Sequence, residues 1–191
     1  PLFGDAGTAT ALEFSEKASP IHFNLQSDGS GSEAIIIPDG GVRNPLTPES
    51  YKEEEKTPGV IRSRRNVALD GIEVFNFSLR EVAPNINELL EFSATQKEDY
   101  EAYIFHQGNK LMNDSIRKKL GVPTEKVPYS LGKYGNTSSA SIPLTIVHAL
   151  RDQLQLGTHK LMLSGFGVGL SWGSISLETE DLVCPKTITY V

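Results

Sequence analysis

The fold is decided by residues 102–109, which read Ala-Tyr-Ile-Phe-His-Gln-Gly-Asn. The first four are apolar and suit a short buried strand, while the polar residues after them lead into a basic segment that extends through Leu120. A buried strand that ends in polar residues at the start of a helix is where α/β folds place their chemistry. We therefore predict a strand over 102–105, a helix through Leu120, and a cleft at the turn between them.

A long helical segment precedes this stretch. Apolar residues recur at three- and four-residue steps, which predicts one buried helical face. Pro84 interrupts the pattern, so the sequence predicts either two helices or one helix kinked at the proline. The residues expected on the buried face are Ile72, Phe75, Leu79, Val82, Ile86, Leu89 and Leu90.

The segments that follow alternate between loop, helix and strand. Residues 132–141 are rich in Gly and Ser and predict a loop, and residues 142–156 predict a helix with Pro143 in its first turn. Residues 160–164 predict a second buried strand, and residues 165–169 a tight glycine loop.

Strand-like runs occupy both ends of the chain. Residues 8–14, 21–26 and 34–37 are separated by turn-forming residues, and 170–177 and 187–191 predict closing strands. The alternation of strands and helices predicts right-handed crossovers and an α/β fold, a mixed sheet covered by helices.

Residues 40–65 differ in composition from the rest of the chain. They contain Pro45, Pro48 and Pro58 and a charged run at 53–56, which is too polar and too often broken by proline to form core. We interpret them as a surface excursion. Because the chain opens on Pro1 rather than Met and leads at once into a strand-like run, we also expect it to be part of a longer protein.

Composition limits the possible functions. The 191 residues carry a formal net charge of −6, so no general positive field attracts nucleic acid or an anionic membrane surface. No apolar run approaches the roughly 18–20 residues that span a bilayer. The single cysteine, Cys184, excludes an internal disulfide framework and suits a reducing compartment, so we expect a cytoplasmic protein without nucleic-acid or membrane partners.

Two polar residues are candidates for chemistry. His106 follows the buried strand directly, and Asn136 lies 30 residues later among small residues that allow a ligand to approach the backbone. Each also has a structural interpretation, His106 as a satisfied polar residue and Asn136 as a turn or helix-capping residue. Side by side, they offer two neutral hydrogen-bond donors to one developing oxyanion, which suits carbanion chemistry without a metal.

The glycine loop at 165–169 reads Gly-Phe-Gly-Val-Gly. Its glycines permit unusual turns and expose backbone N–H groups, although this spacing alone is weakly specific. The Lys-Ser/Thr pair of a phosphate-binding P-loop is missing, and a strand rather than a helix follows. Phosphate binding is therefore not expected.

Four motifs together resemble the 3-oxoacyl-acyl carrier protein synthase III family of condensing enzymes, which have the thiolase fold. Residues 105–109 resemble the family's histidine motif, 135–143 its asparagine motif, 165–173 its terminal glycine motif, and 2–7 the strand that ends its N-terminal half. The resemblance covers nearly the whole chain in order and spacing. It implies that residues 1–191 are a thiolase-like C-terminal catalytic domain, a five-stranded mixed sheet with helices on both faces.

The resemblance also implies residue roles. His106 and Asn136 would stabilise the enolate formed when a malonyl thioester loses carbon dioxide, and the main-chain N–H of Val168 would help hold the thioester oxyanion. Phe75 would line the pantetheine tunnel, with Gly108 and Asn109 beside the same arm. Plain core packing remains the alternative for Phe75.

Two departures from the family pattern matter. The nucleophilic cysteine belongs to the N-terminal half, and Cys184 matches no nucleophile motif, so we expect this chain alone to be inactive. Asn76 and Leu111 stand where many members carry basic residues that face the carrier protein. A basic stripe remains for that contact, or as an ordinary solvated helix face: Arg117, Lys118 and Lys119.

The resemblance implies that the complete enzyme condenses an acyl thioester with malonyl-acyl carrier protein through a Cys-His-Asn triad. Coenzyme A thioesters and acyl carrier protein would be its substrates and partners, with no further cofactor and no metal. A cysteine-bearing N-terminal half and a homodimer mate are expected as well. The rival hypothesis is a non-catalytic thiolase-fold scaffold, or a split subunit that needs a separate cysteine-bearing partner.

Overall fold

The computed structural model describes residues 2–189. Its strands are β1 (His22–Ser27), β2 (Ile35–Ile36), β3 (Glu54–Thr57), β4 (Val60–Arg62), β5 (Ala68–Leu69), β6 (Ala102–Phe105), β7 (Thr158–Gly167) and β8 (Ser171–Glu180). Its α-helices are α1 (Gly71–Phe92), α2 (Lys110–Leu120), α3 (Leu131–Tyr134), α4 (Ser141–Thr145) and α5 (Arg151–Leu154). A π-helical turn, Ile146–Leu150, joins α4 to α5, and short 3₁₀ turns lie at Gly29–Gly31, Pro48–Tyr51, Lys97–Asp99, Thr124–Lys126 and Ser138–Ala140.

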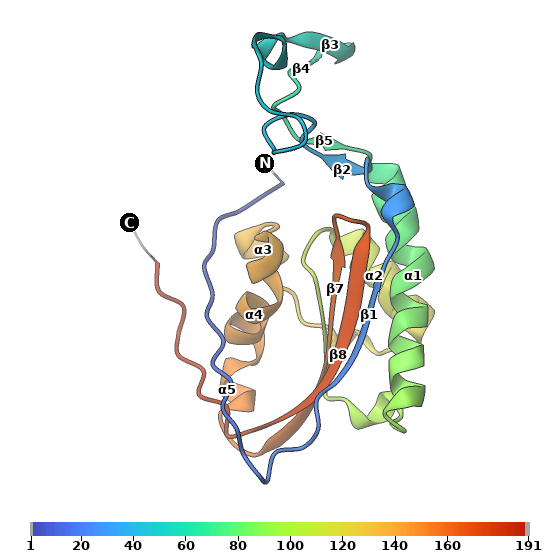
Figure 1. Ribbon diagram of the computed structural model, residues 1–191. Helices are drawn as coiled ribbons and strands as arrows, with labels where there is room; N and C mark the ends of the chain where they lie inside the picture. The colour runs from blue at the N-terminus through green and yellow to red at the C-terminus, as the bar shows by residue number, and fades with distance from the viewer. Residues whose placement is uncertain (1, 190–191) are drawn as a thin grey trace.

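One mixed sheet organises the molecule. Its strand order is β1-β8-β7-β6, with β6 parallel to β7 and the other neighbours antiparallel. Helices α1 and α2 cover one face and α3, α4 and α5 the other (Figure 1). The α/β prediction is confirmed, with four strands in this sheet of the described chain rather than the five expected.

A separate hydrophobic core lies on each face of the sheet. The larger one joins α1 and α2 to the sheet, and the smaller one joins α4 and α5 to it. Strand β6 contributes to both, since Tyr103 and Phe105 point into the first core while Ala102 and Ile104 point into the second. This is why an unbroken apolar run forms the strand that carries the histidine.

Helix α1 is continuous from Gly71 to Phe92. The Asp70 carboxylate caps its first turn by accepting hydrogen bonds from the backbone N–H groups of Ile72 and Glu73. Pro84 removes one backbone donor but does not split the segment, so of the two predicted alternatives a single helix is the one formed. The predicted face is buried or half-buried from Phe75 onward, whereas Ile72 is 76% exposed in the first turn.

Two predicted strands are not formed. Residues 8–14 lack regular structure, and Leu12 and Phe14 in this run are 83% and 89% exposed. Within residues 2–189 no strand pairs with this run, so its backbone has no ladder to join. Residues 187–189 also lack regular structure, and the last two residues of the predicted strand 187–191 lie outside the described residues.

The structure places the element boundaries near the glycine-rich segments differently from the prediction. The helical turn α3, residues 131–134, overlaps the start of the predicted loop 132–141. Strand β7 continues through Gly167, so the turn proper is only residues 168–170. The predicted helix 142–156 is realised as the succession of α4, the π-helical turn and α5. The predicted strands at 21–26, 102–105 and 160–164 and the helix through Leu120 are confirmed.

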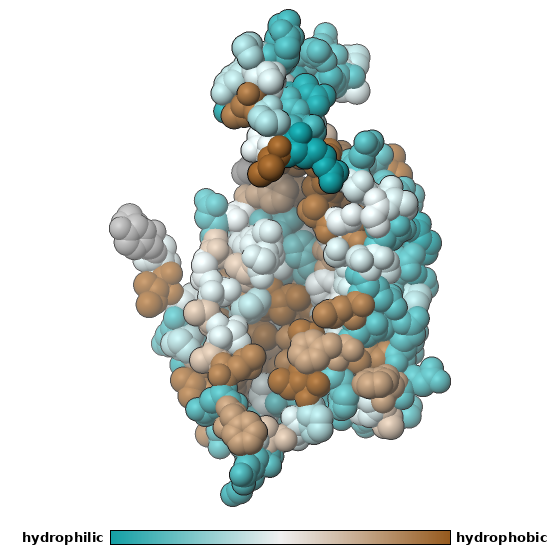
Figure 2. Space-filling view, viewed as in Figure 1, coloured by the Kyte–Doolittle hydropathy of each residue, from teal (hydrophilic) through white to brown (hydrophobic). Residues whose placement is uncertain are grey.

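The edge strand β1 leaves apolar side chains uncovered. Its residues alternate between half-buried and exposed, and Phe23 and Leu25 are 54% and 73% exposed. Figure 2 shows apolar side chains gathered on the viewed face between the α3–α5 side and the α1 side of the molecule.

In residues 2–189, no helix is long and apolar enough to cross a membrane.

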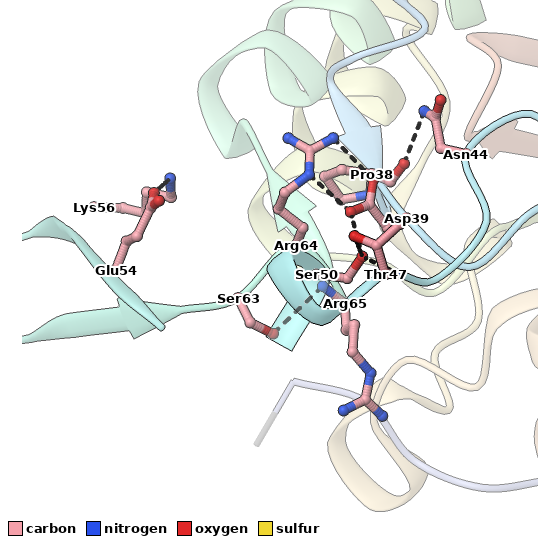
Figure 3. A network of polar contacts seen from close by, with 10 residues as sticks. All are labelled: Pro38, Asp39, Asn44, Thr47, Ser50, Glu54, Lys56, Ser63, Arg64 and Arg65. Atoms are coloured by element: carbon pink, nitrogen blue, oxygen red, sulfur yellow. Dashed lines mark hydrogen bonds and ion pairs between the residues drawn. The ribbon is translucent and has the colours of Figure 1, made fainter. Parts of the chain in front are cut away.

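The excursion at residues 40–65 projects from one end of the sheet on a narrow neck, the pairing of β2 with β5 (Figure 1). Its β3–β4 hairpin is exposed along both strands. A polar cluster closes the base of the excursion (Figure 3). Asp39 accepts two hydrogen bonds from Arg64, at 2.8 Å each, and one from the Ser50 hydroxyl at 2.8 Å.

We predict that Asp39→Asn loosens this base, because the neutral amide cannot hold Arg64 as a two-point ion pair. Backbone amides of the β3–β4 hairpin should exchange with deuterium severalfold faster, while those of β7 should not change. Glu54→Gln, which alters an exposed ion pair with Lys56 on the hairpin itself, is the control. Unchanged exchange in Asp39→Asn would contradict the prediction.

Candidate active site

His106 lies at the end of β6. Its backbone N–H donates to the Ser164 carbonyl at 2.9 Å, which extends the parallel pairing of β6 with β7 by one residue. Its carbonyl accepts a hydrogen bond from the Asn113 side chain at 3.0 Å. Both backbone polar groups of His106 are thus fixed, and the ring position follows from the sheet and from α2.

The imidazole of His106 is held on two sides. Its Nδ1 lies 2.8 Å from the Ser141 hydroxyl, and its ring meets the Phe166 ring edge-on at a centroid distance of 5.7 Å. Burial lowers the pKa of His106 below its ordinary value, and a backbone hydrogen bond with Ser138 offsets part of this effect. The ring is therefore neutral near pH 7.

Asn136 is anchored by the N-terminal segment. Its backbone N–H donates to the Leu2 carbonyl at 3.0 Å, and its carbonyl accepts from the Gly4 N–H at 2.9 Å. Gly135 has a φ of 68°, and a Cβ there would lie 3.1 Å from the Leu2 carbonyl oxygen. Glycine is thus required for the two backbones to pass so closely.

The Asn136 side chain is oriented as a donor. Its Oδ1 accepts a hydrogen bond from the Ser138 backbone N–H at 2.9 Å, the turn-forming interaction common for this residue type. Because the oxygen is engaged in the turn, the Nδ2 amide faces the other way.

The two side chains converge above Gly108. A Cβ placed on Gly108 would lie 3.2 Å from His106 Nε2 and 4.0 Å from Asn136 Nδ2. Both nitrogens therefore border the space that a side chain at residue 108 would occupy. The structure brings together the two residues that the sequence singled out, and Gly108 leaves the space between them open.

The other predicted site residues lie in different settings. Phe75 is half-buried against the larger core, and Val168 is exposed in the turn between β7 and β8. Asn109 caps α2, since its Oδ1 accepts from the N–H groups of Leu111 at 2.8 Å and Met112 at 3.3 Å. Its side-chain oxygen is thus used by the fold, which leaves its Nδ2 for other contacts.

The basic stripe of α2 is partly used for internal contacts. Arg117 donates to the Val122 carbonyl at 2.8 Å, and Lys119 donates to the Leu79 carbonyl at 2.8 Å. Lys118 is exposed. This geometry favours a structural role for Arg117, at the C-terminal end of its own helix.

Cys184 lies apart from the His–Asn pair in the segment after β8. It is buried, its carbonyl accepts from Gln155 next to α5, and burial raises the pKa of its thiol. A buried thiol with a raised pKa is a poor nucleophile.

Among residues 2–189, no group of three or more His, Cys, Asp or Glu side chains is placed to hold a metal ion.

Sequence reasoning missed the buried residues that support the site. Ser141 contacts the His106 ring, Asn113 holds its carbonyl, and Gln107 links the end of β6 to the start of α3. Their spacing could have indicated these residues, because Gln107 adjoins His106 and Asn113 lies one helical turn beyond the N-cap Asn109. Their burial could not be read from polar residue types alone.

Comparison with known proteins relates this chain to a protein family. Residues 90–179 match the model described as 3-oxoacyl-[acyl-carrier-protein (ACP)] synthase III C terminal. The chain is also 33% identical over 178 residues to the beta-ketoacyl-[acyl-carrier-protein] synthase III of Streptococcus pneumoniae (strain Hungary19A-6). The chain belongs to the synthase III family. It covers 52% of that relative, with 92% of its own residues aligned, and so spans about half the length of the curated synthase III proteins it matches.

Solved synthase III structures have the same fold. The 3-oxoacyl-(acyl-carrier protein) synthase from Burkholderia xenovorans LB400 is 39% identical, with a TM-score of 0.78 over 88% of this chain and 46% of that one. The priming beta-ketosynthase from the R1128 polyketide biosynthetic pathway is 27% identical, with a TM-score of 0.64 over 85% of this chain and 45% of that one. The fold described above is thus a thiolase-like half.

We predict that His106 titrates below 6.5, its ordinary pKa, because burial penalises the imidazolium. Between this lowered pKa and 6.5 the unfolded chain binds more protons than the folded one, so the free energy of unfolding should rise with pH. Imidazole resonances followed by NMR from pH 4 to 9 measure the midpoint. His159, whose pKa is raised by its contact with Glu101, is the internal control and should titrate above 6.5.

Proposed function

We propose that this chain supplies the His and Asn of a Cys-His-Asn triad that catalyses decarboxylative condensation of an acyl thioester with malonyl-acyl carrier protein. The acyl group would be carried on a cysteine of a second, N-terminal half. The chain by itself would then be inactive, because Cys184 is buried and its thiol is not activated.

The observation that carries the proposal is the convergence of two neutral donors. An oxygen near the point above Gly108 would receive hydrogen bonds from His106 Nε2 and Asn136 Nδ2. When a malonyl thioester loses carbon dioxide, negative charge moves onto the thioester oxygen. Fixed donors in a partly desolvated site stabilise that charge without reorganising, which accelerates the step.

Neutral donors suit this reaction better than a base or a metal site would. No proton has to be removed to form the enolate, because the carboxylate leaves as carbon dioxide. The lowered pKa of His106 keeps the ring neutral, so it can donate from one nitrogen while the other is held by Ser141. The non-catalytic scaffold hypothesis does not require this arrangement.

The exposed apolar surface supports the presence of a second half. Leu12, Phe14, Phe23 and Leu25 are all more than half exposed. Figure 2 shows apolar side chains gathered on the viewed face, and a surface of this kind marks an interface. We define the interface patch as Phe23 and Leu25 on β1. A cysteine-bearing half packed on this side would cover the patch.

The remaining parts of the proposal follow from the family. Acyl carrier protein and coenzyme A thioesters would deliver the substrates, Phe75 and Asn109 would line their path, and Val168 N–H would hold the acyl-enzyme oxyanion. Lys118 and Lys119 are the exposed basic residues of the stripe on α2 that would meet a carrier protein. A homodimer in the cytoplasm is the expected assembly.

We predict that His106→Ala, in the protein complemented by its cysteine-bearing half, slows decarboxylation about 10²–10³-fold, the usual cost of one lost oxyanion donor. Asn136→Asp should have a similar effect, because it keeps the acceptor for Ser138 but replaces the donor. Release of carbon dioxide from malonyl thioester measures the step. Transfer of the acyl group to the cysteine should be unchanged in both variants, and equal loss of the two steps would contradict the assigned role.

We predict that Phe23→Ser combined with Leu25→Ser weakens binding of the cysteine-bearing half at least tenfold, through loss of roughly 1.5–3 kcal/mol of burial per side chain. Titration calorimetry or size-exclusion chromatography of the mixed halves measures the affinity. Val42→Ser, fully exposed on the distant excursion, is the matched control. Equal binding by the double variant and the control would show that the patch is not the interface.

A further inference from the structure

Ser141 occupies an unusual position for a serine in a helical segment. It is the first residue of α4, is 1% exposed, and directs its hydroxyl at the His106 ring rather than at solvent. It contacts no predicted substrate path and carries no charge. Any effect of its hydroxyl on chemistry therefore passes through the histidine.

The hydrogen bonds around Ser141 define which partner donates. Its Oγ accepts a hydrogen bond from the Gln107 backbone N–H at 3.3 Å, so one lone pair is used. Among the hydrogen bonds of residues 2–189, the one remaining partner of the hydroxyl is His106 Nδ1, at 2.8 Å. A buried hydroxyl hydrogen without an acceptor is costly, which favours donation from the Ser141 O–H to Nδ1. The backbone of Ser138 also contacts the ring and favours its protonated form.

The direction of this hydrogen bond determines which ring nitrogen of His106 carries the proton. If Nδ1 accepts a hydrogen bond, a neutral imidazole carries its proton on Nε2. Nε2 is the nitrogen that faces the open space above Gly108 and Asn136. With the opposite tautomer, Nε2 would present a lone pair to an anionic oxygen and repel it.

We infer that Ser141 is a positioning residue that holds neutral His106 in the Nε2–H tautomer, so that the ring donates into the space shared with Asn136. The tautomer is inferred from the hydrogen bonds of the buried Ser141 hydroxyl, and its value for catalysis rests on the proposed function. Ser141 also lies in the segment that follows Asn136, so one short stretch fixes both donors. Gln107 supports it by occupying the hydroxyl's lone pair.

The test is long-range ¹H–¹⁵N correlation NMR of the imidazole rings at about pH 8, above the ordinary imidazole pKa of about 6.5. In the wild-type chain, His106 should show a protonated Nε2 and a hydrogen-bonded, unprotonated Nδ1. In Ser141→Ala, the Nδ1 resonance should shift downfield toward the value of an unbonded nitrogen. Signals of His106 are assigned by their loss in His106→Gln.

The control is Ser139→Ala, an exposed serine of the same turn, which should leave both His106 resonances unchanged. Ser141→Cys, which keeps a weaker donor, should give an intermediate shift and tests the idea if the alanine variant folds poorly. A proton on Nδ1 in the wild-type chain, or identical His106 resonances in Ser141→Ala, would overturn the inference.

A kinetic readout separates this inference from the proposed function. With the cysteine-bearing half present, Ser141→Ala should lower kcat for carbon dioxide release about fivefold to tenfold with KM unchanged, as expected for one lost supporting hydrogen bond. If the wild-type complex releases no carbon dioxide, the proposed function fails while the NMR result still decides the tautomer.

Discussion

The site depends on the carboxamide of Gln107. This side chain is fully buried, donates to the Phe105 carbonyl at 2.8 Å, and accepts from the backbone N–H groups of Ser130 and Leu131 at 3.1 and 3.3 Å. It thereby ties the end of β6 to the start of α3. Because α3 ends next to Asn136, the same carboxamide fixes the distance between the loops that carry the two donors. Because a buried polar group is costly when it is left unpaired, these contacts favour one geometry of the two loops.

The parts of the fold that the sequence predicted correctly are those stabilised by local patterns. Strand β6 was predictable from its unbroken apolar run, which is typical of a strand covered on both faces. Helix α2 was predictable from its polar N-cap Asn109 and from the apolar residues Met112 and Ile116 on its buried face. His106 follows directly from β6, whereas Asn136 follows α3 and is held by backbone hydrogen bonds to Leu2 and Gly4, far away in the sequence. The two elements depend on local patterns, but the position of Asn136 does not.

The wrong or missing predictions concern features that depend on residues distant in the sequence. Residues 8–14 have the composition of a strand, but a strand forms only beside another, and none in residues 2–189 lies next to them. The sheet of the described residues accordingly has four strands rather than the five expected. The roles of Ser141 and Asn113 were not predictable either, because both are common polar residues whose function is defined by full burial against His106.

Burial gives the His–Asn pair its chemical character under the proposed function. A protonated imidazole would attract an oxyanion more strongly, but it would equally attract the carboxylate of the malonyl group and stabilise the ground state. Desolvation lowers the pKa of His106, so the ring donates a hydrogen bond without carrying charge. Asn136 cannot ionise at all. The two donors therefore bind the oxygen more tightly as its charge develops, which is the differential binding that lowers a barrier.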